Sequence, residues 1–190
     1  MSQKPTGSAY FIEDKRDALE PHTFSILVDN EPGVLSRIAG LFSGRGYNVE
    51  SLTVCETEHT KHLSRFTIVT RGTPMVLAQI KHQLERMVPV HSVVDLTVLG
   101  DPLERELALV KVAGKGDKRI EALRLAEIFR ASVIDASTDH FVFEITGRSS
   151  KIEQFLAIMS ELGMVEVSRT GIAAIGRGAL GMNAREAIAT

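Results

Sequence analysis

The segment from His22 to Val49 constrains the fold of this 190-residue chain more than its other segments do. A β-branched run, His22-Thr-Phe-Ser-Ile-Leu-Val-Asp29, is followed by the polar turn Asn30-Glu-Pro-Gly33 and then by an amphipathic stretch. Gly44 and Gly46 end that stretch, because glycine readily takes the left-handed conformation found at helix ends. The pattern predicts a strand, a helix and a second strand packed into a small space.

The rest of the chain repeats this alternation. In the first half we expect strands at about 23–29, 47–57, 63–70 and 90–99, and helices at about 33–44 and after Thr73-Pro74, where a capping threonine precedes a proline. In the second half we expect strands at about 107–112, 132–137, 141–146 and 165–167. Asp117 would cap a helix at about 118–130, and Ser149 or Ser150 would cap another that ends at Gly163. The order predicts an α+β protein with two ferredoxin-like βαββαβ domains in tandem.

Composition shifts suggest where these domains begin and end. Gly100-Asp-Pro102 interrupts the pattern, so we expect one domain at 22–99 and another at 103–178. The polar residues 1–21 suggest a flexible leader, and the Gly/Ala-rich residues 179–190 a flexible tail. Helices would cover one face of each sheet only. Because a core of roughly 75 residues is thin, we expect a second copy to cover edge strands and the bare face.

Charge and hydropathy exclude several classes of function. The net charge is -2 and Lys and Arg are scattered, which argues against a nucleic-acid partner. No apolar run approaches the roughly 20 residues that span a bilayer, so no membrane partner is expected. The start lacks the apolar core of a signal peptide, which favours a cytoplasmic protein. The single Cys55 excludes an internal disulfide and is expected to be buried in a strand.

Several local patterns resemble functional motifs without their required context. Gly176-Arg-Gly-Ala-Leu-Gly181 matches G-x-G-x-x-G, but only nine residues follow it, too few for a dinucleotide-binding unit. His59 and His62 lie near Glu58 without a third and fourth ligand, so no metal site is expected. The charged triplet Glu104-Arg-Glu106 is expected to be solvated. No Ser/His/Asp set accompanies a nucleophile motif, and no catalytic residue is predicted.

The turn that precedes the first helix is the strongest candidate for a ligand site. A helix N-terminus carries unpaired N–H groups and about half a positive charge, so it can hold a carboxylate. The Asn30 amide can donate and accept, Pro32 would stiffen the turn, and Gly33 would let a ligand approach the backbone. The same residues also suit an ordinary strand-to-helix turn. In that alternative Asn30 caps the helix, and Val34 and Leu35 are core residues.

Longer stretches of the chain resemble a known family. Asp29-Asn-Glu-Pro-Gly-Val-Leu-Ser-Arg-Ile-Ala-Gly-Leu-Phe-Ser43 and Arg45-Gly-Tyr-Asn-Val-Glu-Ser-Leu-Thr-Val54 closely resemble the regulatory (small) subunit of acetolactate synthase, or acetohydroxyacid synthase. Asn-Glu-Pro-Gly-Val-Leu alone is typical of an ACT domain, a ferredoxin-like module that senses small molecules. The likeness covers about residues 22–178 and includes 63–68, 105–112, 127–130 and 166–171.

The resemblance implies a non-catalytic subunit that activates a catalytic partner and confers valine feedback inhibition in branched-chain amino acid (valine, leucine, isoleucine) biosynthesis. The implied partner is the large subunit, which holds thiamine diphosphate, Mg and FAD; none of these is implied in this chain. The resemblance further implies a homodimer in which two ACT domains pair side by side with the effector between them. The matching effector-binding positions are Asn30, Gly33, Val34, Leu35, Asn48 and Val49, and Pro32 joins them as the stiff part of the turn.

Two other functions are less consistent with the sequence. An amino-acid-responsive transcription regulator would need a helix-turn-helix and a basic face, and a stand-alone enzyme would need its own thiamine diphosphate site. The sequence contains neither pattern. A regulatory subunit therefore remains the favoured interpretation.

Overall fold

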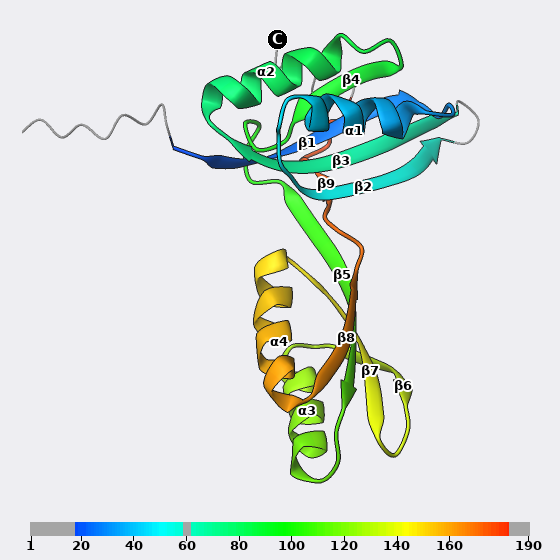
Figure 1. Ribbon diagram of the computed structural model, residues 1–190, viewed down its shortest axis with the longest axis vertical. Helices are drawn as coiled ribbons and strands as arrows, with labels where there is room; N and C mark the ends of the chain where they lie inside the picture. The colour runs from blue at the N-terminus through cyan, green and yellow to red at the C-terminus, as the bar shows by residue number, and fades with distance from the viewer. Residues whose placement is uncertain (1–17, 59–61, 183–190) are drawn as a thin grey trace, which may run out of the picture.

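The computed structural model describes residues 18–58 and 62–182. Figure 1 shows two units, each with helices packed on a sheet, one at each end of the molecule and joined by extended chain. In the first sheet the strand order is β2 (Val49–Glu58), β3 (Leu63–Gly72), β1 (Glu20–Asp29) and β4 (Val90–Asp95). In the second it is β6 (Ser132–Ala136), β7 (His140–Gly147), β5 (Leu103–Ala113) and β8 (Met164–Arg169). The predicted α+β class and the two βαββαβ units are confirmed. His59 and most of the expected leader and tail lie outside the described residues.

The first unit is built on a sheet in which β3 is antiparallel to both β1 and β2. Its two helices lie on one face of this sheet, as Figure 1 shows. The spacing of Val34, Leu35, Ile38, Leu41 and Phe42 predicts one apolar face on the first helix. Val34, Ile38 and Phe42 are buried in a single core with the strands and Leu41 is partly buried, whereas Leu35 is 48% exposed. The elements are β1 (Glu20–Asp29), α1 (Val34–Gly44), β2 (Val49–Glu58), β3 (Leu63–Gly72), α2 (Pro74–Glu85) and β4 (Val90–Asp95).

Strand β4 ends earlier than its alternating pattern predicts. The Asp95 carboxylate accepts hydrogen bonds from the amides of Thr97 and Val98, at 3.1 and 3.4 Å, and this turn stops the ladder. The other Asp95 oxygen lies 2.6 Å from His22 Nδ1. Val98, expected within the strand, is therefore 71% exposed.

The second unit repeats the arrangement around its own core of Ala, Val, Ile, Phe and Met side chains. The predicted caps of its helices are wrong. Gly116 and Arg148 occupy the N-cap positions of α3 and α4, and neither helix has a side-chain cap. Ser149 instead donates to Glu106, 2.8 Å away. The elements are β5 (Leu103–Ala113), α3 (Asp117–Ile128), β6 (Ser132–Ala136), β7 (His140–Gly147), α4 (Ser149–Leu162) and β8 (Met164–Arg169).

Glu106 is buried rather than solvated, with 4% of its surface exposed. Arg169 binds its carboxylate with two hydrogen bonds, Nε to Oε1 at 2.6 Å and Nη2 to Oε2 at 2.8 Å. The Arg169 hydrogen bonds hold the pKa of Glu106 below its ordinary value, and Ser149 adds to this effect, whereas desolvation opposes it. A fully bonded carboxylate therefore replaces an apolar side chain at the start of the second core.

A short strand that the sequence pattern does not predict, β9 (Ala173–Ile175), pairs with Leu103–Arg105 at the start of β5. It lies beneath the first sheet in Figure 1, on the face opposite α1 and α2, which we call the open face. Ala174 packs there against Val94 and Leu96. Met182, from the expected tail, accepts a hydrogen bond from Ser25 at 3.4 Å. The chain itself thus covers part of the face that we expected to be bare.

Cys55 is exposed, contrary to the prediction of a buried thiol. It lies on β2, at the edge of the first sheet, and its side chain is on the open face, where no helix covers it. Within the described residues, no helix has the length and apolar character needed to cross a membrane.

Breaking the Glu106–Arg169 pair should destabilise the second unit. We expect Arg169→Met to lower the free energy of unfolding by about 1.5–3 kcal/mol, because it leaves a buried carboxylate with fewer partners. The matched control is Arg124→Met, since Arg124 is exposed and lies 3.9 Å from Glu121. Chemical denaturation of the three proteins at neutral pH would measure the difference; equal losses for both variants would contradict it.

The same carboxylate predicts a pH dependence. Since the pKa of Glu106 is lowered on folding, its contribution is fully present above the unfolded pKa, about 4.3, and is lost as the pH falls through the folded pKa. The stability difference between the wild type and Glu106→Gln should therefore be constant above that range and shrink below it. A difference that stays constant into acid would refute this assignment.

Candidate functional site

The turn between β1 and α1 is held by backbone hydrogen bonds. The backbone N–H of Asn30 donates to the His62 carbonyl at 2.6 Å, and the backbone N–H of Glu31 donates to the Asp29 carbonyl at 3.0 Å. Gly33 then takes a φ of 88°, a left-handed conformation that costs glycine little. This conformation turns the chain sharply into α1 and leaves the outer side of the turn exposed.

The first turn of α1 has unpaired backbone donors. Gly33 is the N-cap residue and provides no side-chain cap. The Val34 amide donates to the Glu31 carbonyl at 3.3 Å, whereas the amides of Leu35 and Ser36 reach no acceptor in the part of the chain that the structure describes. We call residues 30–36 the α1 entrance. Its free N–H groups and the positive end of the helix dipole favour a carboxylate there.

Asn30 does not cap the helix, so the alternative in which it is the capping residue is wrong. Its side chain is exposed, as are Pro32 and Gly33. No atom lies within 4 Å of the position that a Cβ on Gly33 would take. Arg37 lies at the rim and binds Glu31 at 2.8 Å, so the nearest carboxylate is already paired. The entrance is therefore open, and the Asn30 side-chain amide beside it makes no hydrogen bond within the described part of the chain.

Val34 and Leu35, both candidates for the apolar wall of the site, differ in position. Val34 is 6% exposed and belongs to the core beneath α1, so its side chain does not line a slot as predicted. Leu35 is 48% exposed on the flank of the helix. Only Leu35 offers an apolar surface to a ligand at the entrance.

Asn48 and Val49 lie at the opposite end of the first sheet. Val49 pairs with Thr70, which pairs with His22 at the start of β1, whereas Asp29, next to Asn30, pairs with Leu63 at the other end of β3. Seven residues separate Thr70 from Leu63 along β3, about 23 Å at the rise of a strand. One chain therefore does not bring the two groups of predicted site residues together.

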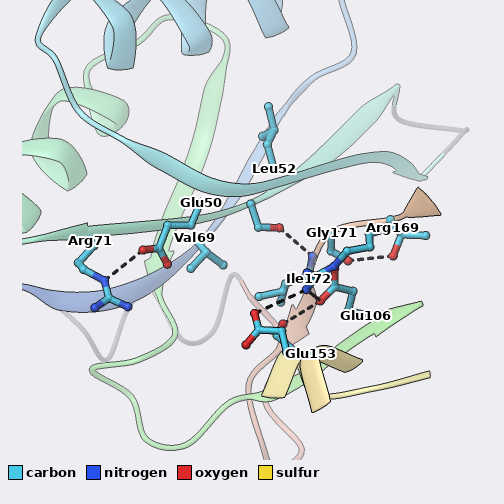
Figure 2. Close-up of a pocket in the computed structure, with 12 residues that line it drawn as sticks. Glu50, Leu52, Val69, Arg71, Glu106, Glu153, Arg169, Gly171 and Ile172 are labelled. Atoms are coloured by element: carbon cyan, nitrogen blue, oxygen red, sulfur yellow. Dashed lines mark hydrogen bonds and ion pairs between the residues drawn. The ribbon is translucent and has the colours of Figure 1, made fainter. Parts of the chain in front are cut away.

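A cavity of about 680 Å³ lies between the two units and is shown in Figure 2. Arg71 and Glu50 line it from the first unit, and Glu106, Glu153 and Arg169 line it from the second. Arg71 binds Glu50 at 3.1 Å, and Arg169 binds Glu106. Because its arginines are already paired, this cavity is less suited to hold a free carboxylate than the α1 entrance is.

The chain that borders this cavity connects β8 to the first unit. Thr170 is tied to Leu107 of the second unit by backbone and side-chain hydrogen bonds. Ile172 is tied to β2, because its amide donates to Ser51 Oγ at 2.8 Å and its carbonyl accepts from Thr53 Oγ1 at 3.0 Å. Gly171 lies between these anchors with a φ of 81°, and a Cβ there would stand 2.8 Å from Ser51 Oγ. Gly171 is thus flanked by one residue bonded to the second unit and one bonded to the first.

Comparison with known proteins assigns both units to one family. A family model described as the small subunit of acetolactate synthase matches residues 105–178, and one for an AHAS small subunit-like ACT domain matches residues 24–92. A probable acetolactate synthase small subunit of Archaeoglobus fulgidus is 44% identical over 157 residues, which is 83% of this chain and 97% of that protein. The Escherichia coli isozyme 3 small subunit is 44% identical over 155 residues, 81% of this chain and 94% of its own length.

The fold agrees with a solved relative. The crystal structure of the small subunit of acetolactate synthase from Thermotoga maritima has a TM-score of 0.77 and 40% sequence identity, and the match covers 85% of this chain and 99% of that one.

The uncapped helix gives a direct test of the site geometry. We expect Asn30→Ala to change the free energy of unfolding by less than about 0.5 kcal/mol, because the side chain makes no cap. Thr73→Ala is the matched comparison: the Thr73 hydroxyl caps α2 by accepting from the Val76 amide, and its loss should cost about 1 kcal/mol. Chemical denaturation would measure both; a larger loss from Asn30→Ala would show that Asn30 has a structural role.

Proposed function

The chain belongs to the acetolactate synthase small-subunit family, and we propose that it is the regulatory subunit that activates the thiamine diphosphate-dependent catalytic subunit and makes it sensitive to valine. The observation that carries this proposal is the open α1 entrance, where two backbone amides and the Asn30 side chain have no hydrogen-bond partner among the described residues. The chain would act in the cytoplasm on branched-chain amino acid synthesis. It would contribute no catalytic group, and thiamine diphosphate, Mg and FAD would belong to the catalytic partner.

The chemistry of free valine matches the entrance. Its carboxylate would accept from the backbone amides of Leu35 and Ser36. The side-chain oxygen of Asn30 would accept a hydrogen bond from the ammonium group. Leu35 would contact the branched side chain. Pro32 would keep the turn rigid, which lowers the ordering cost of binding. One methylene changes affinity by about 1–3 kcal/mol, so leucine and isoleucine would bind more weakly without being rejected outright.

A homodimer would complete the site. Strand β2 is at the edge of the first sheet, and its end at Glu58 lies in the same row as Asp29. If a second copy pairs its β2 antiparallel to this one, the start of its β2 lies beside the end of ours. Asn48 and Val49 of the second copy would then stand near Asn30 and Gly33. A two-fold axis at this edge therefore brings together the residues that one chain keeps apart.

Apolar side chains along the same edge support this pairing. Leu52 and Val54 of β2 are 37% and 41% exposed and pair with the core residues Ile68 and Phe66, so they lie on the helix side of the sheet. Leu35 and Val49 are similarly exposed. An edge strand with uncovered apolar side chains tends to pair with another chain. Burying this edge in a dimer would protect it.

Regulation would follow from two shapes of the dimer. One would favour the active arrangement of the catalytic subunit, and valine would bind the other more tightly and shift the population toward it. A coupling of about 1–3 kcal/mol gives about 5- to 150-fold regulation. The anchors around Gly171 offer a route from β2 to the second unit.

The experiment that tests the function combines ligand binding with partner capture. Thermal unfolding of the chain would be followed with valine, leucine, isoleucine and unrelated amino acids, and the catalytic subunit would be sought by co-purification. We expect the largest stabilisation from valine and a thiamine diphosphate-dependent partner. No shift with any branched-chain amino acid, together with no such partner, would refute the proposal.

Charge at position 33 should decide whether a carboxylate binds the entrance. We expect Gly33→Asp to weaken valine binding by about tenfold or more relative to Gly33→Asn, because a like charge near 4 Å costs about 1–4 kcal/mol. Asn and Asp both tolerate a positive φ, and the added side chain meets open space, so both variants should fold. Calorimetry would measure valine affinity; equal affinities would place the site elsewhere.

Reciprocity gives a second test. If valine changes the state of the catalytic subunit, that subunit must change the affinity for valine by the same factor. Calorimetric titration of valine into the chain alone and into the assembled complex should therefore give different dissociation constants. An unchanged constant would exclude the coupling even if valine binds.

A further inference from the structure

A groove of about 460 Å³ runs along the open face of the first sheet, between that face and the ribbon formed by β9 and the start of β5. Thr53, Cys55 and Thr57 of β2 and Arg65 of β3 form its wall on the sheet, and Leu103 and Ile175 form its wall on the ribbon. It is on the opposite face from α1 and α2, and is distinct from the α1 entrance and from the cavity in Figure 2.

Arg65 is the unusual residue of this groove. Its Nε atom is buried and has no hydrogen-bond partner in the described part of the chain. A buried donor without a partner is costly, and guanidinium groups in proteins are normally paired with a carboxylate or phosphate. The unpaired donor indicates that the groove is incomplete in the isolated chain.

The charges around the groove favour an anionic group. Arg105 also lines it, and its guanidinium donates only to the Glu104 carbonyl, at 2.7 Å, among the hydrogen bonds that the structure describes. None of the described lining residues is acidic. Thr53 and Thr57 add hydroxyl groups to the sheet wall. Two arginines without an opposing carboxylate would attract one from outside.

The rest of the groove is apolar. Leu103 and Ile175 are 37% and 54% exposed on the ribbon, next to the exposed Cys55. An arginine surrounded by uncovered apolar side chains is typical of the centre of a protein–protein interface. The groove therefore fits a protein segment with a carboxylate flanked by apolar side chains.

We propose that this groove is a docking surface for the catalytic subunit, which inserts an acidic side chain against Arg65 and packs apolar neighbours on Leu103 and Ile175. The proposal rests on the regulatory function argued above. A second copy of this chain fits less well, because a two-fold contact through the open face would place arginines against arginines. The β2 edge already accounts for pairing between copies.

Cys55 provides a readout that needs no mutation, because it is the only cysteine of the chain and it lies in the groove. Thiol alkylation would be timed on the full chain alone, with valine, and with the catalytic subunit, and the peptide that contains Cys55 would be quantified by mass spectrometry. We expect alkylation to slow several-fold only when the catalytic subunit is bound. Undiminished reactivity in a complex shown to be assembled would overturn the proposal.

Substitutions then test the charge. We expect Arg65→Met to weaken the complex with the catalytic subunit by about thirtyfold or more, and Arg65→Lys to weaken it less, since lysine keeps the charge but not the paired donors. Arg124→Met, on the exposed side of α3, is the control and should bind as the wild type does. Arg65→Met removes an unpaired buried donor, so it should fold. Ile175→Glu, at the exposed rim, would add a repelling charge and give an independent second variant.

The outcomes separate the two proposals. Wild-type affinity in both Arg65→Met and Ile175→Glu would overturn the docking surface while leaving the regulatory function intact. A wild-type chain that binds no catalytic subunit would refute the function itself. If Arg65→Met changes the oligomeric state of the chain alone and leaves its affinity for the catalytic subunit unaltered, the groove binds a second copy, and the proposal is overturned.

Discussion

An α-helix begins with backbone N–H groups that its own carbonyls cannot reach, and the two helices of the first unit meet this constraint differently. The Thr73 hydroxyl caps α2, whereas α1 begins at a glycine with a positive φ and has no side-chain cap. Among the described residues, the amides of Leu35 and Ser36 have no acceptor and the Asn30 side chain has no hydrogen-bond partner. The turn therefore combines donors, a positive field and an adaptable side-chain amide at one point.

The position of this turn matters because the sheet below it is connected to the second unit. Strand β2 contacts the connecting chain through Ser51 and Thr53, which bind both backbone groups of Ile172. On the other side of Gly171, Thr170 is bound to the second sheet. Only Gly171 separates these two anchors, so a displacement of β2 would be transmitted to the second unit through a single residue.

The sequence predicted the features that depend on local chemistry. The spacing of Val34, Ile38 and Phe42 placed α1 on its sheet, and Thr73-Pro74 marked the start of α2 correctly. The sequence left open whether Asn30 caps the first helix, and only the structure shows that it does not.

The errors arose where tertiary contacts overrode local patterns. Glu106 was expected in solvent because it is charged. It nevertheless alternates in step with the buried Ala108 and Val110 on β5, and this alternation indicates a buried position. Strand β9 is three residues long and only Ala174 of its two alanines is buried, so it leaves no hydrophobic pattern in the sequence. Cys55 was misplaced because a single strand does not reveal whether its sheet face is covered. The separation between Asn30 and Asn48 likewise depends on strand register. That separation makes ligand binding depend on concentration: if a ligand must contact Asn30 of one copy and Asn48 of another, only the dimer binds it, and dilution would abolish binding while each unit stays folded.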